Sequence, residues 1–349
     1  MTNPTPNQSL TNTPHPGELL TLAGQAANQA AGAAVFADYR GRKAKNTLRR
    51  QAADLALFNQ FLVGAGVPVG DLAGDPGSWT GVTWGLAAAF TSWQLKNGYA
   101  VTTINGRLST VKVYCSLAAL GGVINPDELA LIRAVRGYEH KEQKHIDEKR
   151  SAAGLGTRKP GAKKAEAVRI TPTQARALKD QPNTPQGRRD ALLMALMLDL
   201  GLRVGELAAL TVDNFNLGDK TMTFYRPKVD RVQTHDLKNG CLAAVRAWLN
   251  SSEAPAVGSI WRASRKGGEL QDVGLTTRGI TKRVLCLGKR AGVVGLSAHD
   301  LRHYWATQAA RNNTPLDRLQ DAGGWASLAM PGRYIEAAKI ANQGVNLGE

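Results

Sequence analysis

The sequence predicts a mainly helical protein of two domains, the second of which carries a small antiparallel sheet. Its 349 residues are close to two domains at roughly 150 residues each. Most apolar residues recur at helical spacing between capping residues and glycines. Only residues 220–225 and 231–237 read as strands, joined by a short turn. The hydrophobic share of 43% is enough for ordinary buried cores.

The charge of the chain indicates what kind of partner it binds, and its cysteine content indicates the cellular compartment. Lys and Arg number 44 against 28 Asp and Glu, a net charge of +16. Such an excess favours a polyanionic partner, nucleic acid first, with solubility or a membrane surface as alternatives. No apolar run is long enough to span a membrane, and the N-terminus lacks a secretory signal. The three cysteines form no CxxC pair, which argues against a disulfide scaffold or zinc ribbon and predicts a cytoplasmic protein.

The first half of the chain divides into a tail and a helical domain. Residues 1–30 carry no Lys or Arg and four prolines, which predicts a disordered tail. Residues 31–137 are expected to form a small all-helical domain. Four helices are expected there: one capped by Asn46 and ending at Gly64, one over residues 82–95, one from about Thr103 to Gly121, and one opening at Asn125-Pro126-Asp127.

A linker and a second domain follow. Residues 138–168 lose the helical period and are rich in charge, Gly and Ala, so they are expected to be a basic linker, either tracking phosphates or simply solvated. The second domain, residues 169–349, starts at the cap Thr171-Pro172. Its apolar helix DALLMALMLDL ends at Gly201, and the strand pair described above comes next.

Four places in the second domain carry residues suited to chemistry. They are Arg203 and Glu206 in GLRVGEL, Lys228 in the strand turn, His299, Arg302 and His303 in SAHDLRHYWAT, and Trp325 nine residues before Tyr334. If SAHDLRHYWAT is helical, His299, Arg302 and His303 share one face, because i, i+3 and i+4 positions are neighbours. Two arginines, a lysine and a histidine favour a phosphate site, since guanidinium groups clamp non-bridging oxygens.

The sequence lacks the residues that P-loop and two-metal phosphate chemistry require. No GxxxxGK[ST] loop is present, and no cluster of carboxylates for two metals adjoins these motifs. His299 and His303 have the spacing of a metal pair, but no third ligand is evident. What remains is phosphoryl transfer without metal or other cofactor, carried out by a side-chain nucleophile.

These motifs, in this order and spacing, resemble the signature of the tyrosine recombinase (phage integrase) family. The strings GLRVGELAAL and HDLRHYWAT and the nine-residue gap to Tyr334 carry the resemblance, and GYAVTTINGRLSTVKVYCSLAALGG resembles the family's helical, SAM-like core-binding domain. The likeness covers roughly residues 35–345. The family usually has histidine where this chain has Trp325, and the local run AGGW resembles the Cre-like members.

The resemblance implies a mechanism for the catalytic residues. Tyr334 would attack a DNA phosphodiester to give a 3′-phosphotyrosyl bond, while Arg203 and Arg302 hold the phosphate. Lys228 would protonate the departing 5′-oxygen, although Lys220, Arg226 and Arg231 lie close by on the expected hairpin. The remaining roles are proton transfer or a phosphate hydrogen bond for His299, packing beneath the site for Trp325, and orientation of the site for Glu206.

The resemblance also implies the partners. The substrate would be double-stranded DNA with paired inverted recognition sequences, bound by a tetramer whose last segment, after Tyr334, docks on a neighbouring subunit, with strand exchange through a Holliday junction. A type IB topoisomerase, a telomere resolvase and a non-catalytic DNA-binding relative are the alternatives. Cations of the first domain expected to contact phosphates are Arg40, Arg42, Lys43, Lys45, Arg49, Arg50, Arg107 and Lys112.

Overall fold

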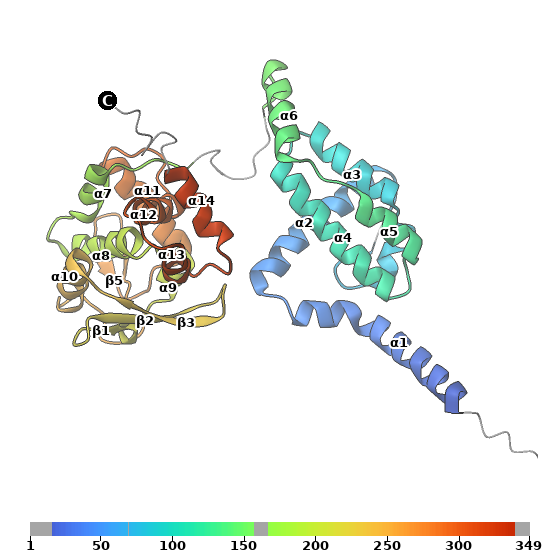
Figure 1. Ribbon diagram of the computed structural model, residues 1–349, viewed down its shortest axis with the longest axis horizontal. Helices are drawn as coiled ribbons and strands as arrows, with labels where there is room; N and C mark the ends of the chain where they lie inside the picture. The colour runs from blue at the N-terminus through green and yellow to red at the C-terminus, as the bar shows by residue number, and fades with distance from the viewer. Residues whose placement is uncertain (1–15, 69, 157–166, 339–349) are drawn as a thin grey trace, which may run out of the picture. The chain divides into compact units, whose positions relative to one another are not determined.

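The chain folds into two units with separate cores in a computed structural model that describes residues 16–68, 70–156 and 167–338 (Figure 1). Close contacts divide it into Met1–Lys163 and Lys164–Glu349. Both units are mainly helical and the second contains small antiparallel sheets, as the sequence predicts. Within the described residues no helix is long and apolar enough to cross a membrane.

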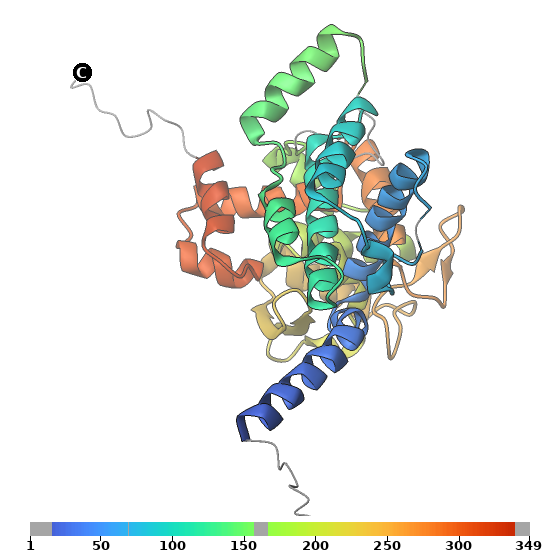
Figure 2. The same ribbon diagram turned by 90° about the vertical axis from the view of Figure 1, so that its right-hand side faces the viewer.

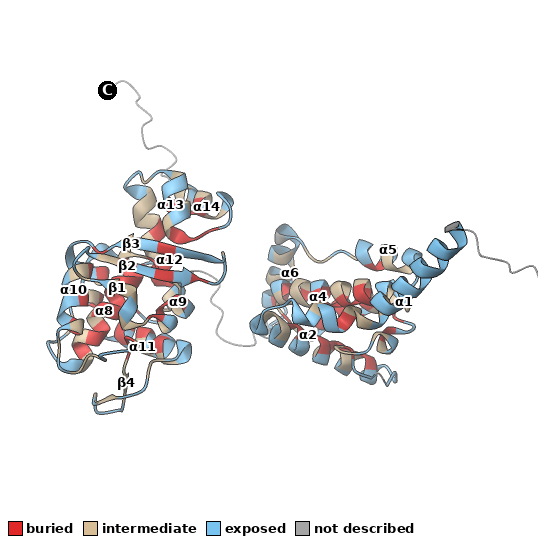
Figure 3. Ribbon diagram, turned by 90° about the horizontal axis from the view of Figure 1, so that it is seen from below, coloured by how far each residue is buried: buried red, intermediate tan, exposed pale blue. Residues whose placement is uncertain are grey.

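Unit 1 is all-helical among its described residues. Its helices are α1 (Pro16–Gly41), α2 (Lys45–Gly64), η1 (Pro76–Trp79), α3 (Trp84–Lys96), α4 (Val101–Leu120), α5 (Pro126–Ala134) and α6 (His140–Ala152). Helix α5 begins as predicted, since Asn125 Oδ1 accepts the Glu128 N–H at 2.7 Å and Pro126 occupies the first turn. Helix α4 runs through the middle of the unit, and its buried residues line the core (Figure 3).

An aromatic cluster fills the core of unit 1. The ring of Phe58 on α2 lies 5.0 Å from Phe90 on α3 and 5.8 Å from Trp79, and Trp79 lies 6.0 Å from Tyr114 on α4. The Trp79 indole N–H donates to the Leu72 carbonyl at 3.0 Å, so its one polar atom is satisfied in the core. The cluster therefore holds α2, α3 and α4 together.

Residues 16–30 are helical, so the expected disorder of residues 1–30 is wrong for this part of the tail. They form the first half of α1, and this half extends away from the other helices of unit 1 (Figure 2). Residues 17–31 are all exposed. The run is rich in alanine, the strongest helix former, which compensates locally for the absence of burial. Helix α2 also differs in detail: its N-cap is Ala44, while Asn46 Oδ1 accepts from Arg49 Nη2 at 2.6 Å instead of capping.

Part of the expected linker is helical too. Within residues 138–168, α6 occupies His140–Ala152, and residues 157–166 lie outside the described residues. Arg150, one of the cations of the expected basic linker, is buried and donates to the carbonyls of Leu95 at 2.6 Å and Tyr99 at 3.1 Å. Helix α6 is thus fastened to unit 1, because Arg150 satisfies carbonyls at the end of α3.

Unit 2 surrounds the apolar helix α8 (Pro185–Asp199), buried along most of its length (Figure 3). The other helices are α7 (Pro172–Lys179), α9 (Val204–Ala209), η2 (Val212–Asn214), α10 (Asn239–Leu249), α11 (Thr277–Arg290), α12 (Ala298–Arg311), α13 (Leu316–Gly323) and α14 (Ala329–Ala338). Residues 339–349, the rest of the segment expected to dock on a neighbour, lie outside the described residues.

The predicted strand pair is part of a three-stranded antiparallel sheet in unit 2. Its strands, in spatial order, are β1 (Phe215–Asn216), β2 (Thr221–Arg226) and β3 (Arg231–Asp236). A separate short hairpin pairs β4 (Ala263–Ser264) with β5 (Leu270–Gln271). Burial alternates along β2, with Met222, Phe224 and Arg226 facing inward, as expected for a strand with one buried face.

Candidate functional site

Three arginines converge on the C-terminal end of α13. Arg203 precedes α9, Arg226 ends β2, and Arg302 lies in α12, yet all three donate to backbone carbonyls of residues 322–324. The last carbonyls of a helix lack partners within it and carry its negative end, so they attract cations. Segments distant in sequence are thereby brought to one point.

Arg203 is held by the helix that it introduces. Its backbone N–H donates to Glu206 Oε2 at 2.8 Å, and its Nη1 donates to Glu206 Oε1 at 2.7 Å. Glu206 is buried, whereas the Arg203 side chain keeps 23% of its surface exposed. Its Nη2 reaches the Gly324 carbonyl at 2.9 Å. The carboxylate therefore orients a guanidinium group that still has access to solvent.

Arg302 is more deeply buried, with 4% exposure. Its Nη1 donates to the Gly201 carbonyl at 2.5 Å, its Nη2 donates to the Gly323 carbonyl, and its guanidinium lies 4.6 Å from the Trp325 ring centre. Burial, assisted by the charge of Arg203, lowers the pKa of Arg302 to about 10. The group still carries its positive charge at neutral pH.

The glycine break before Arg203 has a structural reason. Gly201 has φ +63°, and a Cβ there would lie 2.3 Å from the Trp305 ring. Only glycine adopts this backbone conformation without strain and allows the ring so close. The turn places the Gly201 carbonyl against Arg302, and the chain then continues through Leu202 and Arg203 into α9.

Tyr334 lies beside this group on the buried face of α14. Its ring is 5% exposed and packs 5.5 Å from Trp325 and 4.9 Å from His303, in a small cluster with Ala306 and Leu319. Because Trp325 also stacks under Arg302, the indole links the tyrosine to the arginines. The structure therefore brings Arg203, Glu206, Arg302, Trp325 and Tyr334 together.

Electrostatics at Tyr334 oppose one another. Burial raises the pKa of the phenol, and the nearby positive charges of Arg302, Arg203 and Arg333 act against that rise. The net pKa is above the ordinary value, so the resting residue is a neutral phenol. Its proton must be accepted by another group when the oxygen attacks.

Of the other predicted residues, Lys228 and His299 are exposed and His303 is half-buried. Lys228 is exposed in the turn over residues 227–230, which follows directly on Arg226, and His299 is exposed in the first turn of α12. His303 is half-buried and edge-on to Tyr334; burial, with the charge of His299, lowers its pKa. Lys228 and His299 thus face solvent, where a bound polyanion would reach them.

Sequence reasoning missed Arg226 as part of the site, although it named the residue as a neighbour of Lys228. Its side chain is fully buried and contacts Glu206, His235 and the end of α13. The alternation along β2 carried the signal, because an arginine at the inward position of a strand requires buried partners.

The expected DNA contacts in unit 1 fall into two sets. The six cations exposed at the end of α1 and the start of α2 are Arg40, Arg42, Lys43, Lys45, Arg49 and Arg50. Arg107 is instead half-buried over the Tyr99 ring, 4.3 Å from its centre, and donates to Gln94 at 3.2 Å.

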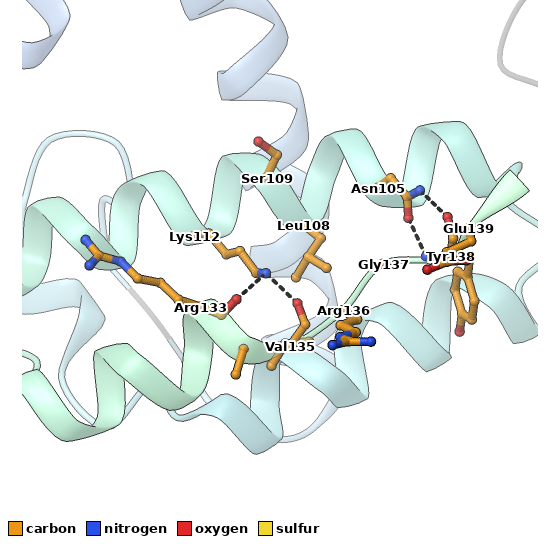
Figure 4. A pocket seen from close by; sticks show the side chains of 11 residues that line it. Asn105, Leu108, Ser109, Lys112, Arg133, Val135, Arg136, Gly137, Tyr138 and Glu139 are labelled. Atoms are coloured by element: carbon orange, nitrogen blue, oxygen red, sulfur yellow. Dashed lines mark hydrogen bonds between the residues drawn. The ribbon is translucent and has the colours of Figure 1, made fainter.

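Lys112 likewise serves the fold of unit 1. In a groove of about 800 Å³ between α4 and the end of α5, its ammonium donates to the carbonyls of Arg133, at 2.9 Å, and Val135 (Figure 4). Partial burial lowers its pKa. The charged groups of Arg107 and Lys112 thus stack or cap carbonyls within the unit, and their contact with phosphates stays a prediction.

Among the described residues, no three His, Cys, Asp or Glu side chains gather in a group that could hold a metal ion.

Comparison with known proteins gives a family and a fold. Residues 168–340 match the Phage integrase family. The tyrosine recombinase XerC of Bifidobacterium longum subsp. infantis is 23% identical over 267 residues, 71% of this chain and 72% of that protein. XerC of a Mycobacterium species is 25% identical over 265 residues, 72% of this chain and 78% of that protein.

Solved structures of low sequence identity share the fold. The Tn1549 transposon integrase in complex with circular intermediate DNA has a TM-score of 0.60 at 14% identity, covering 91% of this chain and 99% of that one. A lambda integrase tetramer bound to a Holliday junction has a TM-score of 0.59 at 13% identity, covering 89% and 78%. These likenesses confirm the predicted fold class.

Proposed function

Since residues 168–340 belong to the phage integrase family, the chain is a tyrosine recombinase that breaks and rejoins DNA, and we propose that Tyr334 is its nucleophile. The observation that carries the assignment is the contact of the Tyr334 ring with Trp325, on which the Arg302 guanidinium stacks. A phenol beside two phosphate-binding cations is the arrangement that covalent phosphoryl transfer requires.

The reaction balances within these groups. The Tyr334 oxygen loses its proton and bonds to phosphorus, and the bond from phosphorus to the 5′-oxygen breaks. Arg203 and Arg302 hold the non-bridging oxygens, whose negative charge increases in the transition state. His299 accepts a proton or hydrogen-bonds the phosphate, and Trp325, which has only one N–H donor, supports the site by packing. The covalent bond keeps the energy of the phosphodiester, so rejoining needs no cofactor.

Lys228 is the proposed general acid, and sulfur chemistry tests it. We expect Lys228→Ala to slow cleavage of ordinary DNA by about 10²- to 10⁴-fold, the range for a lost proton donor. A substrate with sulfur in place of the scissile 5′-oxygen should restore the rate, because a thiolate leaves without protonation. Single-turnover cleavage of both substrates measures this.

The matched control is Lys220→Ala, which removes a lysine at the other end of β2. It should cleave both substrates at the wild-type rate. An unchanged rate for Lys228→Ala, or a defect that sulfur does not relieve, would remove Lys228 from the mechanism.

We propose that the DNA substrate carries paired inverted sites bound by four chains. The solved lambda integrase tetramer on a Holliday junction supports this assembly by likeness of fold. The tryptophan at 325 supports a Cre-like member, and access to intracellular DNA implies a cytoplasmic location. Selection of bound sequences from random DNA, followed by exchange between two selected sites, tests the proposal; relaxation of supercoils or hairpin ends without exchange would contradict it.

Unit 1 is proposed to contact DNA phosphates through its exposed cations, so binding should weaken steeply with salt. The logarithm of the binding constant should fall by about 0.9 per neutralised phosphate against the logarithm of salt concentration. Arg49→Ala should reduce that slope by about 0.9, because one phosphate contact is lost. Fluorescence anisotropy over a salt series measures the slope.

Arg49→Lys serves as the control, since it keeps the charge and should keep the slope. A slope that is flat in the wild type, or equal in all three proteins, would show that this cluster does not bind phosphates.

A further inference from the structure

Arg226 is an arginine without access to solvent, a costly placement that partners at its two terminal nitrogens offset, while its Nε has no partner among the described residues. Its Nη1 donates to the Gly323 carbonyl at 2.9 Å and lies 3.4 Å from Glu206 Oε1. Its Nη2 donates to the Ala322 carbonyl at 2.9 Å and lies 3.3 Å from His235 Nε2. These partners come from α9, α13 and β3, so one side chain joins three elements.

The imidazole of His235 fits this role. Burial, with the charge of Arg226, lowers the pKa of His235 to about 4. The ring is therefore neutral near pH 7, and its Nε2 can accept a hydrogen bond from the guanidinium without adding a further charge.

Arg226 shares its acceptors with the two phosphate-binding arginines. Arg302 also donates to the Gly323 carbonyl, and Arg203 donates to both Glu206 and the adjoining Gly324 carbonyl. Arg203 and Arg226 thus contact one carboxylate, and all three cations donate to the negative end of one helix. Arg226 contacts Glu206 and the end of α13 from the protein interior, and these are the same groups that hold Arg203 and Arg302.

Arg226 packs tightly against the turn formed by Gly323, Gly324 and Trp325. Gly324 has φ +56°, and a Cβ there would lie 2.6 Å from Arg226 Cδ. Gly323 packs tightly against Trp325, since a Cβ at residue 323 would lie 2.1 Å from the indole ring. A shift of the Arg226 guanidinium therefore moves the turn that bears Trp325 and the carbonyls used by Arg203 and Arg302.

We propose that Arg226 is a positioning residue for DNA cleavage: its buried guanidinium holds the end of α13 and Glu206 so that Arg203 and Arg302 point at the scissile phosphate. The proposal rests on the proposed function, because it assumes that these two arginines bind that phosphate. Arg226 acts through them, since it has no exposed surface with which to touch DNA.

Arg189 provides a matched control in the same unit. It is also fully buried, and it donates to Asp190 Oδ1 at 2.7 Å and to the Arg262 carbonyl at 2.6 Å. None of these partners belongs to the site. Arg189→Ala therefore reports what the loss of a buried arginine does to folding alone.

The experiment is single-turnover formation of the covalent DNA adduct at saturating nicked substrate, which separates the rate constant from the fraction of active protein. Arg226→Ala should lower the rate constant by about 10²-fold, as for the loss of one preorganised donor, while its soluble, folded fraction reacts to completion. Ethylguanidinium should restore part of the rate by filling the vacated space, and ethylammonium, which lacks the planar fork, should not. Arg189→Ala should lower only the active fraction.

The outcomes are distinct. A wild-type rate constant in the folded fraction of Arg226→Ala, or equal rescue by both cations, would overturn the positioning role. If Arg226→Ala does not fold, Arg226→Lys decides: it keeps the charge but lacks the planar fork that reaches Glu206, His235 and the end of α13 together, so a lowered rate constant supports the proposal and an unchanged one overturns it. A wild-type chain without any adduct would instead contradict the proposed function, and the role of Arg226 with it.

Discussion

Tyr334→Phe is expected to abolish the covalent DNA adduct, lowering cleavage by at least about 10⁴-fold, because no nucleophilic oxygen remains at the site. The fold should persist, since phenylalanine keeps the ring contacts with Trp325 at 5.5 Å and His303 at 4.9 Å. Binding to DNA should change little. The measurement is a denaturant-stable protein–DNA complex on a nicked substrate that traps the cleaved strand.

The control for this substitution is Tyr304→Phe, which removes a half-buried phenol from α12 without touching the cluster around Trp325. It should form the adduct as the wild type does. If the adduct survives in Tyr334→Phe, or disappears equally in Tyr304→Phe, residue 334 is not the nucleophile.

Arg302→Ala should lower the cleavage rate constant by about 10²- to 10³-fold, or roughly 3 to 4 kcal/mol of barrier. The guanidinium is preorganised by the Gly201 and Gly323 carbonyls and by the Trp325 ring, so its charge is in place before the phosphate arrives. In the variant the Gly201 carbonyl loses the Arg302 donor, whereas the Gly323 carbonyl keeps that of Arg226, so the fold should also be destabilised by about 1–3 kcal/mol for the one unsatisfied group. Single-turnover rates and urea unfolding separate the two effects.

Arg311→Ala is a suitable comparison, because Arg311 ends the same helix with an exposed side chain. It should leave both the rate constant and the unfolding midpoint near the wild-type values. An Arg302→Ala protein that reacts at the wild-type rate would exclude Arg302 from phosphate binding.

Local pattern explains which parts of the fold could be predicted from the sequence. Helical spacing and caps located α2 to α5, α7 and α8 to within a few residues, and the β2–β3 hairpin followed from its strand residues and turn. Disorder was wrongly expected for residues 16–30 because composition reports the capacity for burial, whereas this alanine-rich run is helical without it. Helix α6 was missed because its charged sequence has no apolar period, and Arg150, which fastens it to unit 1, has partners some 50 residues away in sequence.

The site shows the same division between local and long-range information. Arg203, Glu206, Arg302, Trp325 and Tyr334 could be nominated from motifs, since each motif is contiguous. The inward direction of Arg107 and Lys112 could not, because a count of charges does not say where a side chain points. For Arg226, the alternation along the strand predicts burial, but its partners are known only from the tertiary structure.

The paired glycines after α13 restrict how this enzyme can diverge or be engineered. Any side chain at 323 would collide with an indole and any at 324 with a guanidinium, so both positions are closed to substitution while the remainder of the site is kept. Libraries meant to retarget the enzyme to new DNA should therefore leave this dipeptide constant and place their diversity on exposed residues, where natural drift among relatives is also free to accumulate.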